Sequence, residues 1–186
     1  PDIHLGQLAL RVGNPLPTSQ AFFALLHGLM AGKVAVAAGD WPETLRYYEP
    51  ILNLPYFPPE VLPDFYTYGV YLDAGRAYNG QGRFQQALAC WQKAAHLEPR
   101  KGEIHHLLGL AYSALGQETP AVQAYLQAIE LQVDDPGVYY NLGLSLVRLN
   151  RLPEAVAAFE ACVARKPDAD AYVNLGVLYT NAGQRE

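Results

Sequence analysis

Apolar positions recur along this chain with the spacing of helices rather than the alternation of strands. From residue 68 onward, apolar side chains return every three or four residues, which places them on one side of a helix. The apolar stretches are short, and glycine, asparagine or proline separates them. These residues favour helix ends and tight turns. The pattern therefore predicts a series of short amphipathic helices in an all-α chain.

The helical pattern repeats at a nearly constant interval. Its marker is a glycine that recurs after 34, 34 and 33 residues: Gly75, Gly109, Gly143 and Gly176. Sixteen residues after the first three of these glycines come the aromatics Trp91, Tyr125 and Phe159. Alanine stands four residues before each aromatic, and alanine or cysteine stands three residues after it. An interval of this length indicates a solenoid of stacked helix pairs.

Each interval divides into two helices. We expect the first helix of each pair over residues 68–80, 103–115, 137–149 and 171–182. The second helix presents its alanine and aromatic positions as one stripe. Small residues on both helices let the helix axes approach to about 8–10 Å. The aromatic ring then fills the space that the small residues leave.

These offsets resemble the tetratricopeptide repeat, whose 34-residue unit carries an aromatic, Leu-Gly, Tyr, Ala, Phe, Ala and Pro at these places. The resemblance implies a right-handed superhelical solenoid of antiparallel helix pairs. It indicates complete repeats at 68–101, 102–135 and 136–168, followed by a partial repeat at 169–186. Val133 in place of a closing proline and Asn150 in place of a glycine depart from the pattern without changing the fold that it implies.

The first third of the chain matches the repeat only in part. Gly32 and Gly39 keep the seven-residue offset between the packing glycine and the turn glycine, which predicts a degenerate repeat over 25–58. A proline- and aromatic-rich insertion follows at 59–67. We expect residues 54–67 to form a stiff, ordered loop rather than a helix. Residues 1–24 are expected to be an irregular segment or a leading helix, with 3–12 as a candidate short helix.

The last repeat stops after its first helix. A terminal repeat normally presents a polar face, whereas Val173, Val177 and Leu178 are apolar. We expect the second helix of this repeat to belong to a longer parent protein. The alternative is that the final helix itself caps the array.

Composition restricts the classes of partner. The 186 residues are 51% apolar with a formal net charge of −5, which is ample for a folded core and argues against a general nucleic-acid binder. The apolar stretch at 21–38 is interrupted by His27 and Lys33, so a buried helix is favoured over a membrane span. Cys90 and Cys162 cannot form a disulfide framework and slightly favour a reducing, cytoplasmic compartment.

The sequence carries no motif of catalysis. It has no zinc-protease, nucleophile-elbow, P-loop or dinucleotide signature. His105 and His106 are adjacent, and neighbouring side chains on a helix point about 100° apart, so the pair cannot chelate one metal ion. We therefore expect no enzyme activity, no cofactor and no metal site.

With chemistry excluded, function is expected on the surface that stacking creates. By the resemblance, the first helix of each repeat lines the concave side of the solenoid. The groove residues that this implies are Arg76, His106, Leu110, Tyr140, Asn141, Leu144, Arg148, Asn174 and Asn181. A second candidate contact is the aromatic group Tyr56, Phe57, Phe65 and Tyr66, whose alternative role is to fill the join between repeats.

Asn141 and Asn174 both occupy the sixth position of their repeats. The repeat arm of O-linked GlcNAc transferase has asparagines at this place, holding the backbone of an extended peptide. An amide suits this role because it both donates and accepts hydrogen bonds. The alternative is a structural hydrogen bond, and Asp73 and Leu107 interrupt the series upstream. Tyr140 is either an anchor for a partner or a ring lying over its own helix.

The carboxylate clamp that some family members use for a chaperone C-terminus is not matched. Only Asn141 fits one frame of it, and Asp170 would repel a carboxylate. We therefore favour a non-catalytic scaffold that binds an extended peptide or a helix of another protein in the concave groove. Two alternatives stay open: the repeat arm of a larger enzyme with a catalytic domain beyond residue 186, and a structural subunit of a permanent assembly. The sequence does not indicate an oligomeric state.

Overall fold

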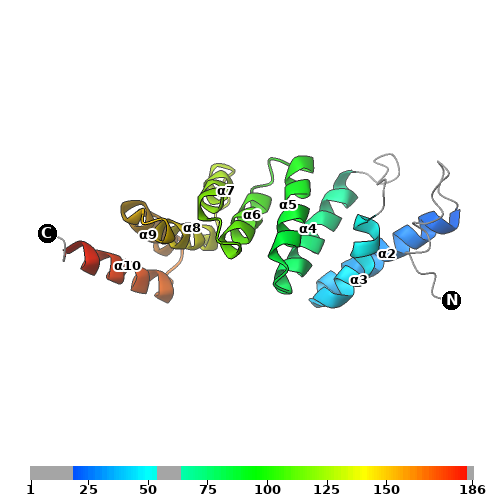
Figure 1. The fold of residues 1–186 in the computed structure, drawn as a ribbon, viewed down its shortest axis with the longest axis horizontal. Coiled ribbons are helices and arrows are strands. Elements are labelled where there is room, and N and C mark those ends of the chain that lie inside the picture. The colour runs from blue at the N-terminus through cyan, green and yellow to red at the C-terminus, as the bar shows by residue number, and fades with distance from the viewer. Residues whose placement is uncertain (1–18, 54–63, 184–186) are drawn as a thin grey trace. The chain divides into compact units, whose positions relative to one another are not determined.

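The structure is a computed structural model that describes residues 19–53 and 64–183, with side chains described at 23–53 and 67–181 (Figure 1). All regular secondary structure in these ranges is helical. The helices are α2 (Ser19–Ala38), α3 (Trp41–Leu52), α4 (Asp64–Gly80), α5 (Phe84–Leu97), α6 (Gly102–Ala114), α7 (Glu118–Glu130), α8 (Pro136–Arg148), α9 (Leu152–Arg165) and α10 (Ala169–Gly183). The predicted all-α architecture is confirmed.

The helices group into two compact units, one ending at Leu97 and the other beginning at Glu98. In the first unit, α2 packs against α3, α3 against α4, and α4 against α5. In the second unit, α6 packs against α7, α7 against α8, and α8 against α9, with α10 packed on α9. Each unit is thus built from successive helix–turn–helix pairs.

A glycine lies against an aromatic ring within each of the four helix pairs. A β-carbon added at Gly75, Gly109 or Gly143 would lie 2.2, 2.4 or 2.8 Å from the ring of Trp91, Tyr125 or Phe159. At Gly32 the same β-carbon would lie 2.0 Å from the ring of Tyr48, so α2 and α3 pack in the same way as the later pairs. The four rings are almost completely buried. Glycine is required here because only a residue without a side chain admits a ring at this distance.

The turns inside the pairs adopt the left-handed backbone that the sequence predicts. Gly39, Gly82 and Gly116 have φ near +70°, and Asn150 takes the same place with φ of 58°. An additional positive φ of 62° occurs at Gln132, directly before Val133. Val133 packs beside Gly102, and its β-branched side chain replaces the proline that ends other repeats.

Two helix starts differ from expectation. The segment expected to be a loop through residue 67 is already helical from Asp64, so Phe65 and Tyr66 belong to α4 rather than to a loop. Helix α2 begins at Ser19, six residues before the predicted start of the degenerate repeat. The candidate contacts Tyr56 and Phe57, the rest of the expected loop and the candidate helix at 3–12 lie outside the described residues.

Helix α2 packs against α3 rather than standing alone. Its side chains Leu25, Leu29 and Ala35 are buried. Within the described residues, no helix has both the length and the apolar character needed to cross a bilayer.

Both cysteines are buried thiols without a disulfide. Cys90 lies in α5 of the first unit, and Cys162 lies in α9 of the second unit. Burial raises the pKa of the Cys90 thiol to about 11, and it also raises the pKa of the Cys162 thiol. Both thiols are therefore protonated and unreactive in the folded chain at neutral pH.

Candidate functional site

The predicted groove residues divide between the two units. Arg76 lies on α4 of the first unit. The others lie on α6, α8 and α10 of the second unit: His106, Leu110, Tyr140, Asn141, Leu144, Arg148, Asn174 and Asn181. The two sets are therefore described separately.

Helices α6 and α8 lie side by side and run in the same direction. Near the start of α8, Nδ1 of His106 lies 3.8 Å from Oδ2 of Asp135. At the end of α8, Nη1 of Arg148 donates a 2.7 Å hydrogen bond to Oγ of Ser113, which lies seven residues after His106 on α6. These two contacts join the same faces of both helices at both ends, so the side chains between them form one continuous surface. We call this surface the α6/α8 face. Leu110 of α6 and Tyr140, Asn141 and Leu144 of α8 stand between the two contacts along the helices.

The middle of the α6/α8 face is apolar. Leu110 and Leu144 are half-buried and pack on the hydrophobic core of the second unit. The ring of Tyr140 also rests on this core, with its centroid 5.8 Å from that of Phe159 at an interplanar angle of 63°. Tyr140 thus packs edge-to-face on the neighbouring helix and keeps part of its surface accessible. Leu110, Tyr140 and Leu144 therefore all pack against the same core.

The two asparagines have different surroundings. Asn174 donates from Nδ2 to the backbone oxygen of Asp170 one turn earlier, at 2.9 Å. Asn141 is half-buried, and its amide makes no hydrogen bond with any side chain or backbone group that the structure describes. Among the described residues, neither asparagine forms a hydrogen bond between two helices. Asn141 therefore presents a donor and an acceptor to the α6/α8 face.

His106 is more buried than a groove residue is expected to be. Its side chain is 16% exposed, and its ring lies 6.1 Å from that of Tyr125, centroid to centroid. Burial lowers the pKa of the His106 imidazole, although Asp135 and Glu103 oppose the shift. His106 is therefore neutral at pH 7 and packs as an aromatic ring. Its Nε2 is buried and has no hydrogen-bond partner within the described part of the chain.

Arg148 has a structural role that sequence reasoning missed. Besides Ser113, its Nη1 donates to Oε1 of Glu118 on α7 at 3.0 Å. The Glu118 side chain is only 12% exposed, so the guanidinium compensates a largely buried carboxylate. Arg148 thus links the end of α8 to both helices of the preceding repeat. Asn181, at the equivalent position of α10, is exposed.

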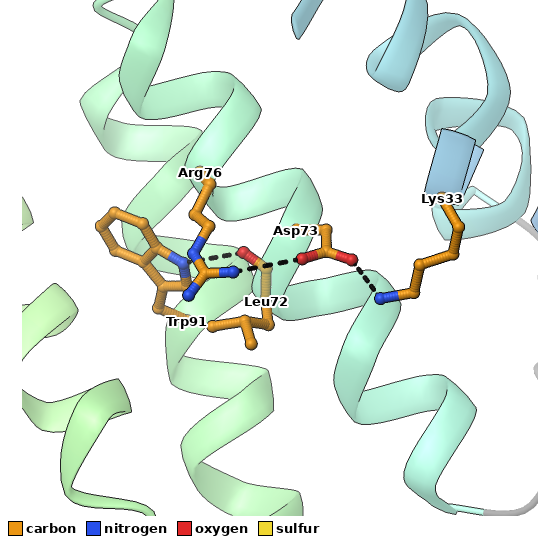
Figure 2. Close-up of polar contacts among 5 residues, drawn as sticks. All are labelled: Lys33, Leu72, Asp73, Arg76 and Trp91. Carbon is orange, nitrogen blue, oxygen red and sulfur yellow. Dashed lines mark hydrogen bonds and ion pairs between the residues drawn. The ribbon is translucent and has the colours of Figure 1, made fainter. Parts of the chain in front are cut away.

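Arg76 belongs to a charge cluster in the first unit (Figure 2). Asp73, on the same helix, is almost fully buried, and Nη1 of Arg76 lies 3.4 Å from its Oδ1. The ammonium of Lys33, from α2, pairs with the other carboxylate oxygen of Asp73. Beside these side chains, Nε1 of Trp91 donates to the backbone oxygen of Leu72 at 3.2 Å. The cluster joins α2 to α4 and presents two cations around one buried anion.

The pairing in this cluster could have been found from the repeat numbering. Lys33 and Arg76 both occupy the ninth position of their repeats, and Asp73 occupies the sixth. Successive first helices lie side by side in this fold, as α2 and α4 or α6 and α8 do. A buried acidic residue in the sixth position therefore faces the ninth positions of its own repeat and of the preceding one.

The described histidines and acidic residues do not gather into a metal site. His105 is bound through Nε2 to the backbone oxygen of Pro99 at 2.9 Å. In the part of the chain that the structure describes, no group of three His, Cys, Asp or Glu side chains is arranged to hold a metal ion.

Family models of the repeat match most of this fold. A model described as "TPR repeat" matches residues 75–116 and 114–150, and one described as "Tetratricopeptide repeat" matches residues 140–184. The chain belongs to the tetratricopeptide repeat family. The matches begin at the packing glycine Gly75, within α4, and continue through α10.

Solved tetratricopeptide structures share the fold. The crystal structure of MamA protein matches with a TM-score of 0.73 at 23% identity, covering 87% of this chain and 84% of that one. The crystal structure of YrrB, described as "a TPR protein with an unusual peptide-binding site", matches with a TM-score of 0.69 at 23% identity, covering 86% and 78%. The first repeat domain of Spaghetti (RPAP3), bound to the HSP90 peptide SRMEEVD, matches with a TM-score of 0.61 at 21% identity, covering 63% and 94%. The comparison with curated proteins returned no match.

Proposed function

We propose that this chain is a non-catalytic scaffold that binds an extended segment of a partner protein on the α6/α8 face. The observation that carries the proposal is the amide of Asn141. It is half-buried and makes no hydrogen bond within the described structure, and it stands one helical turn before Leu144 on α8. A polar group in such a place gains most when a ligand supplies its hydrogen-bond partners.

The chemistry of this face fits a peptide rather than a small ion. An asparagine amide can donate to a backbone carbonyl and accept from a backbone N–H, whatever the peptide sequence. Leu110 and Leu144 offer apolar contact to alternate side chains of an extended segment. The accessible part of the Tyr140 ring supplies an aromatic anchor of the kind that dominates binding energy at interfaces.

Two of the similar structures support peptide binding as the function. YrrB is described by its peptide-binding site, and the Spaghetti domain holds an HSP90 peptide. The recognition proposed here differs from a clamp on a terminal carboxylate, since the α6/α8 face presents a neutral His106 and an Arg148 already bound to Glu118. We therefore expect the partner segment to be held through its backbone and apolar side chains.

The test begins with a peptide library displayed on phage and selected on the purified chain. The affinity of a selected peptide is then measured for the wild type and for Asn141→Ala combined with Asn174→Ala. Loss of one buried hydrogen bond predicts binding weaker by about tenfold, with an unchanged melting temperature. Gln123→Ala, at an exposed position on α7, is the matched control and leaves the affinity unchanged.

Two outcomes contradict the proposal. If the double variant binds the peptide as tightly as the wild type, the α6/α8 face is not the site. If the double variant melts at a much lower temperature, the asparagines stabilise the fold and their amides are not reserved for a ligand.

A further inference from the structure

The cluster of Lys33, Asp73 and Arg76 in the first unit carries more positive than negative charge. Asp73 supplies one carboxylate, and its side chain is only 4% exposed. The side chains of Lys33 and Arg76 supply two cations and are 56% and 36% exposed. Solvent therefore meets the cations rather than the anion, and one positive charge is left without a counterion within the cluster.

The buried carboxylate holds both cations in place. The Lys33 ammonium contacts one oxygen of Asp73, and Nη1 of Arg76 lies 3.4 Å from the other oxygen (Figure 2). An ammonium has three N–H groups, and Asp73 is the hydrogen-bond partner of Lys33 among the described residues. Since Asp73 already restricts these two long side chains, an anion that binds them costs less side-chain entropy.

Gly69 leaves the surface of α4 open beside the Lys33 ammonium. Gly69 stands one turn before Asp73 on this helix. A β-carbon added at Gly69 would lie 3.4 Å from Nζ of Lys33, and the Lys33 side chain is the only neighbour that it would meet within 4 Å. A ligand can thus approach the ammonium over Gly69 without meeting a side chain at that position.

A buried hydroxyl without a hydrogen bond accompanies the carboxylate. The Tyr48 side chain is fully buried, and its hydroxyl has no hydrogen-bond partner within the described part of the chain. Burial raises the pKa of this hydroxyl, and the negative charge of Asp73 raises it further. A small shift would let the hydroxyl donate to Asp73 when a ligand draws one of the cations toward itself. The buried carboxylate would then keep its hydrogen bonds.

We propose that Lys33 and Arg76 bind a glutamate or aspartate side chain of a partner protein. The partner's carboxylate takes the solvent side of the cluster and neutralises the one positive charge that Asp73 leaves. A phosphate group carries a charge of about −1.5 to −2, which exceeds that positive charge and is repelled more strongly by Asp73. The site lies in the first unit and the α6/α8 face lies in the second, so the proposal does not rest on peptide binding to that face.

The probe is the peptide acetyl-Ala-Ala-Glu-Ala-Ala-amide, whose blocked ends leave the glutamate side chain as its only charge. NMR of the isotope-labelled chain at low salt follows the Lys33 ammonium and the Arg76 guanidinium during a titration. Saturable shifts of both groups are expected, with a dissociation constant of about 1–10 mM for this single contact. The peptide with glutamine in place of glutamate is expected to bind about fivefold more weakly or not at all. Arg46, an exposed cation paired with Glu43, is the internal control and should shift much less.

Variants at Gly69 locate the site without removing a cation from the buried carboxylate. Gly69→Glu places a carboxylate of the chain itself beside Lys33 and is expected to weaken binding of the peptide by about tenfold or more. Gly69→Gln has nearly the same shape without the charge, and as the matched control it should retain the affinity within about threefold. Both variants replace a glycine inside α4 and should therefore not lower the melting temperature.

Four results would overturn the proposal. The first is the absence of saturable shifts up to about 50 mM peptide. The second is equal binding of the glutamate and glutamine peptides, or equal binding of the glutamate peptide to Gly69→Glu and Gly69→Gln, since the carboxylate would then not be recognised at Lys33. The third is tighter binding of inorganic phosphate than of the peptide, which would make this a phosphate site. The fourth is a shift of the Lys33 ammonium in the free chain on Glu60→Gln or Asp2→Asn, since the occupant would then be this chain itself.

Discussion

Helices α8 and α10 carry the same residue types in the same order, but the packing glycine is buried on α8 and exposed on α10. Both have tyrosine at the fourth position, leucine at the seventh and glycine at the eighth. On α8 the glycine is buried beneath Phe159, whereas on α10 the glycine is exposed and no described residue lies against it. The repeat residues of a first helix therefore form a surface onto which a second helix can pack. Whether this surface is buried depends on the presence of that second helix.

The comparison also indicates where stability lies. In a linear array each helix gains most of its stability from its neighbours. Helix α8 has packing partners in α7 and α9, whereas α10 packs on α9. A glycine inside a helix costs about 1 kcal/mol relative to alanine. That cost is offset on α8 by the burial of an aromatic ring, and on α10 nothing in the described structure offsets it.

The largest effect is expected from removing the ring that covers Gly143. Phe159→Ala leaves a cavity in the core and should lower the free energy of unfolding by about 3–5 kcal/mol. Tyr172→Ala on α10 removes a ring that is 54% exposed and should change stability by less than about 0.5 kcal/mol. Urea denaturation followed by circular dichroism measures both. A similar loss in the two variants would mean that α10 is as well covered as α8.

Filling the glycine positions is expected to have the next largest effect. Gly143→Leu forces a side chain into the Phe159 ring, only 2.8 Å from the added β-carbon, and should destabilise the second unit by about 1–3 kcal/mol or more. Gly176→Leu places its side chain in solvent and should stabilise α10 by up to about 1 kcal/mol through helix propensity. Thermal melts of the two variants distinguish the positions. An unchanged melt for Gly143→Leu would show that the packing register is wrong.

Smaller differences are expected at the ends of the two helices. Arg148→Met leaves the largely buried Glu118 carboxylate without its cation, and should cost about 1 kcal/mol because the guanidinium itself is half exposed. Asn181→Ala, at the equivalent position of α10, should be neutral. The double variant Arg148→Met with Glu118→Gln is expected to recover most of the loss in urea denaturation. Failure of that recovery would mean that Arg148 acts through Ser113 instead.

The smallest effect is a dependence of stability on pH. Burial lowers the pKa of His106 in the folded chain, so the unfolded chain, with a pKa near 6.5, binds more protons. The contribution of the His106 imidazole to the free energy of unfolding is therefore fully present above about pH 6.5, and it is lost as the pH falls below that value. The urea midpoint of His106→Phe should therefore fall less between pH 7.5 and 5.5 than that of the wild type.

Val173→His is the control for this measurement. Val173 occupies the same fifth position on α10 and is 65% exposed, so a histidine there should titrate alike in both states and add no pH dependence. If His106→Phe loses as much stability as the wild type over this range, the neutral form of His106 is not favoured by folding.

The helix pairs could be predicted because one local rule repeats. The sixteen-residue offset between glycine and aromatic fixes which residues of two helices meet, and it holds at Gly32 and Tyr48 as well as in the complete repeats. The prediction of a loop through residue 67 is wrong for residues 64–67, because the prolines before α4 do not prevent a helix from starting after them. Proline disfavours helix in the residue before it, and all four prolines of that segment precede Asp64.

The site was less predictable than the fold. Leu110, Tyr140 and Leu144 all pack against the core of the second unit, since each residue's place on its helix fixes the side that it faces. The contact of Arg148 with Glu118 could not be predicted, because a long side chain can reach a carboxylate on another helix. Likewise, nothing in a single position of the sequence shows that the Asn174 amide is used by its own backbone while that of Asn141 is not.

The two buried thiols allow the opening of each unit to be measured separately. Cys90 belongs to the first unit and Cys162 to the second, and neither reacts while its helix is packed. A pulse of alkylating reagent therefore labels a unit only during the time that it is open. Mass spectrometry of the two labelled peptides gives two separate opening rates from one unmodified sample. Alkylation of the two native cysteines thus measures the opening of each unit without any engineered probe.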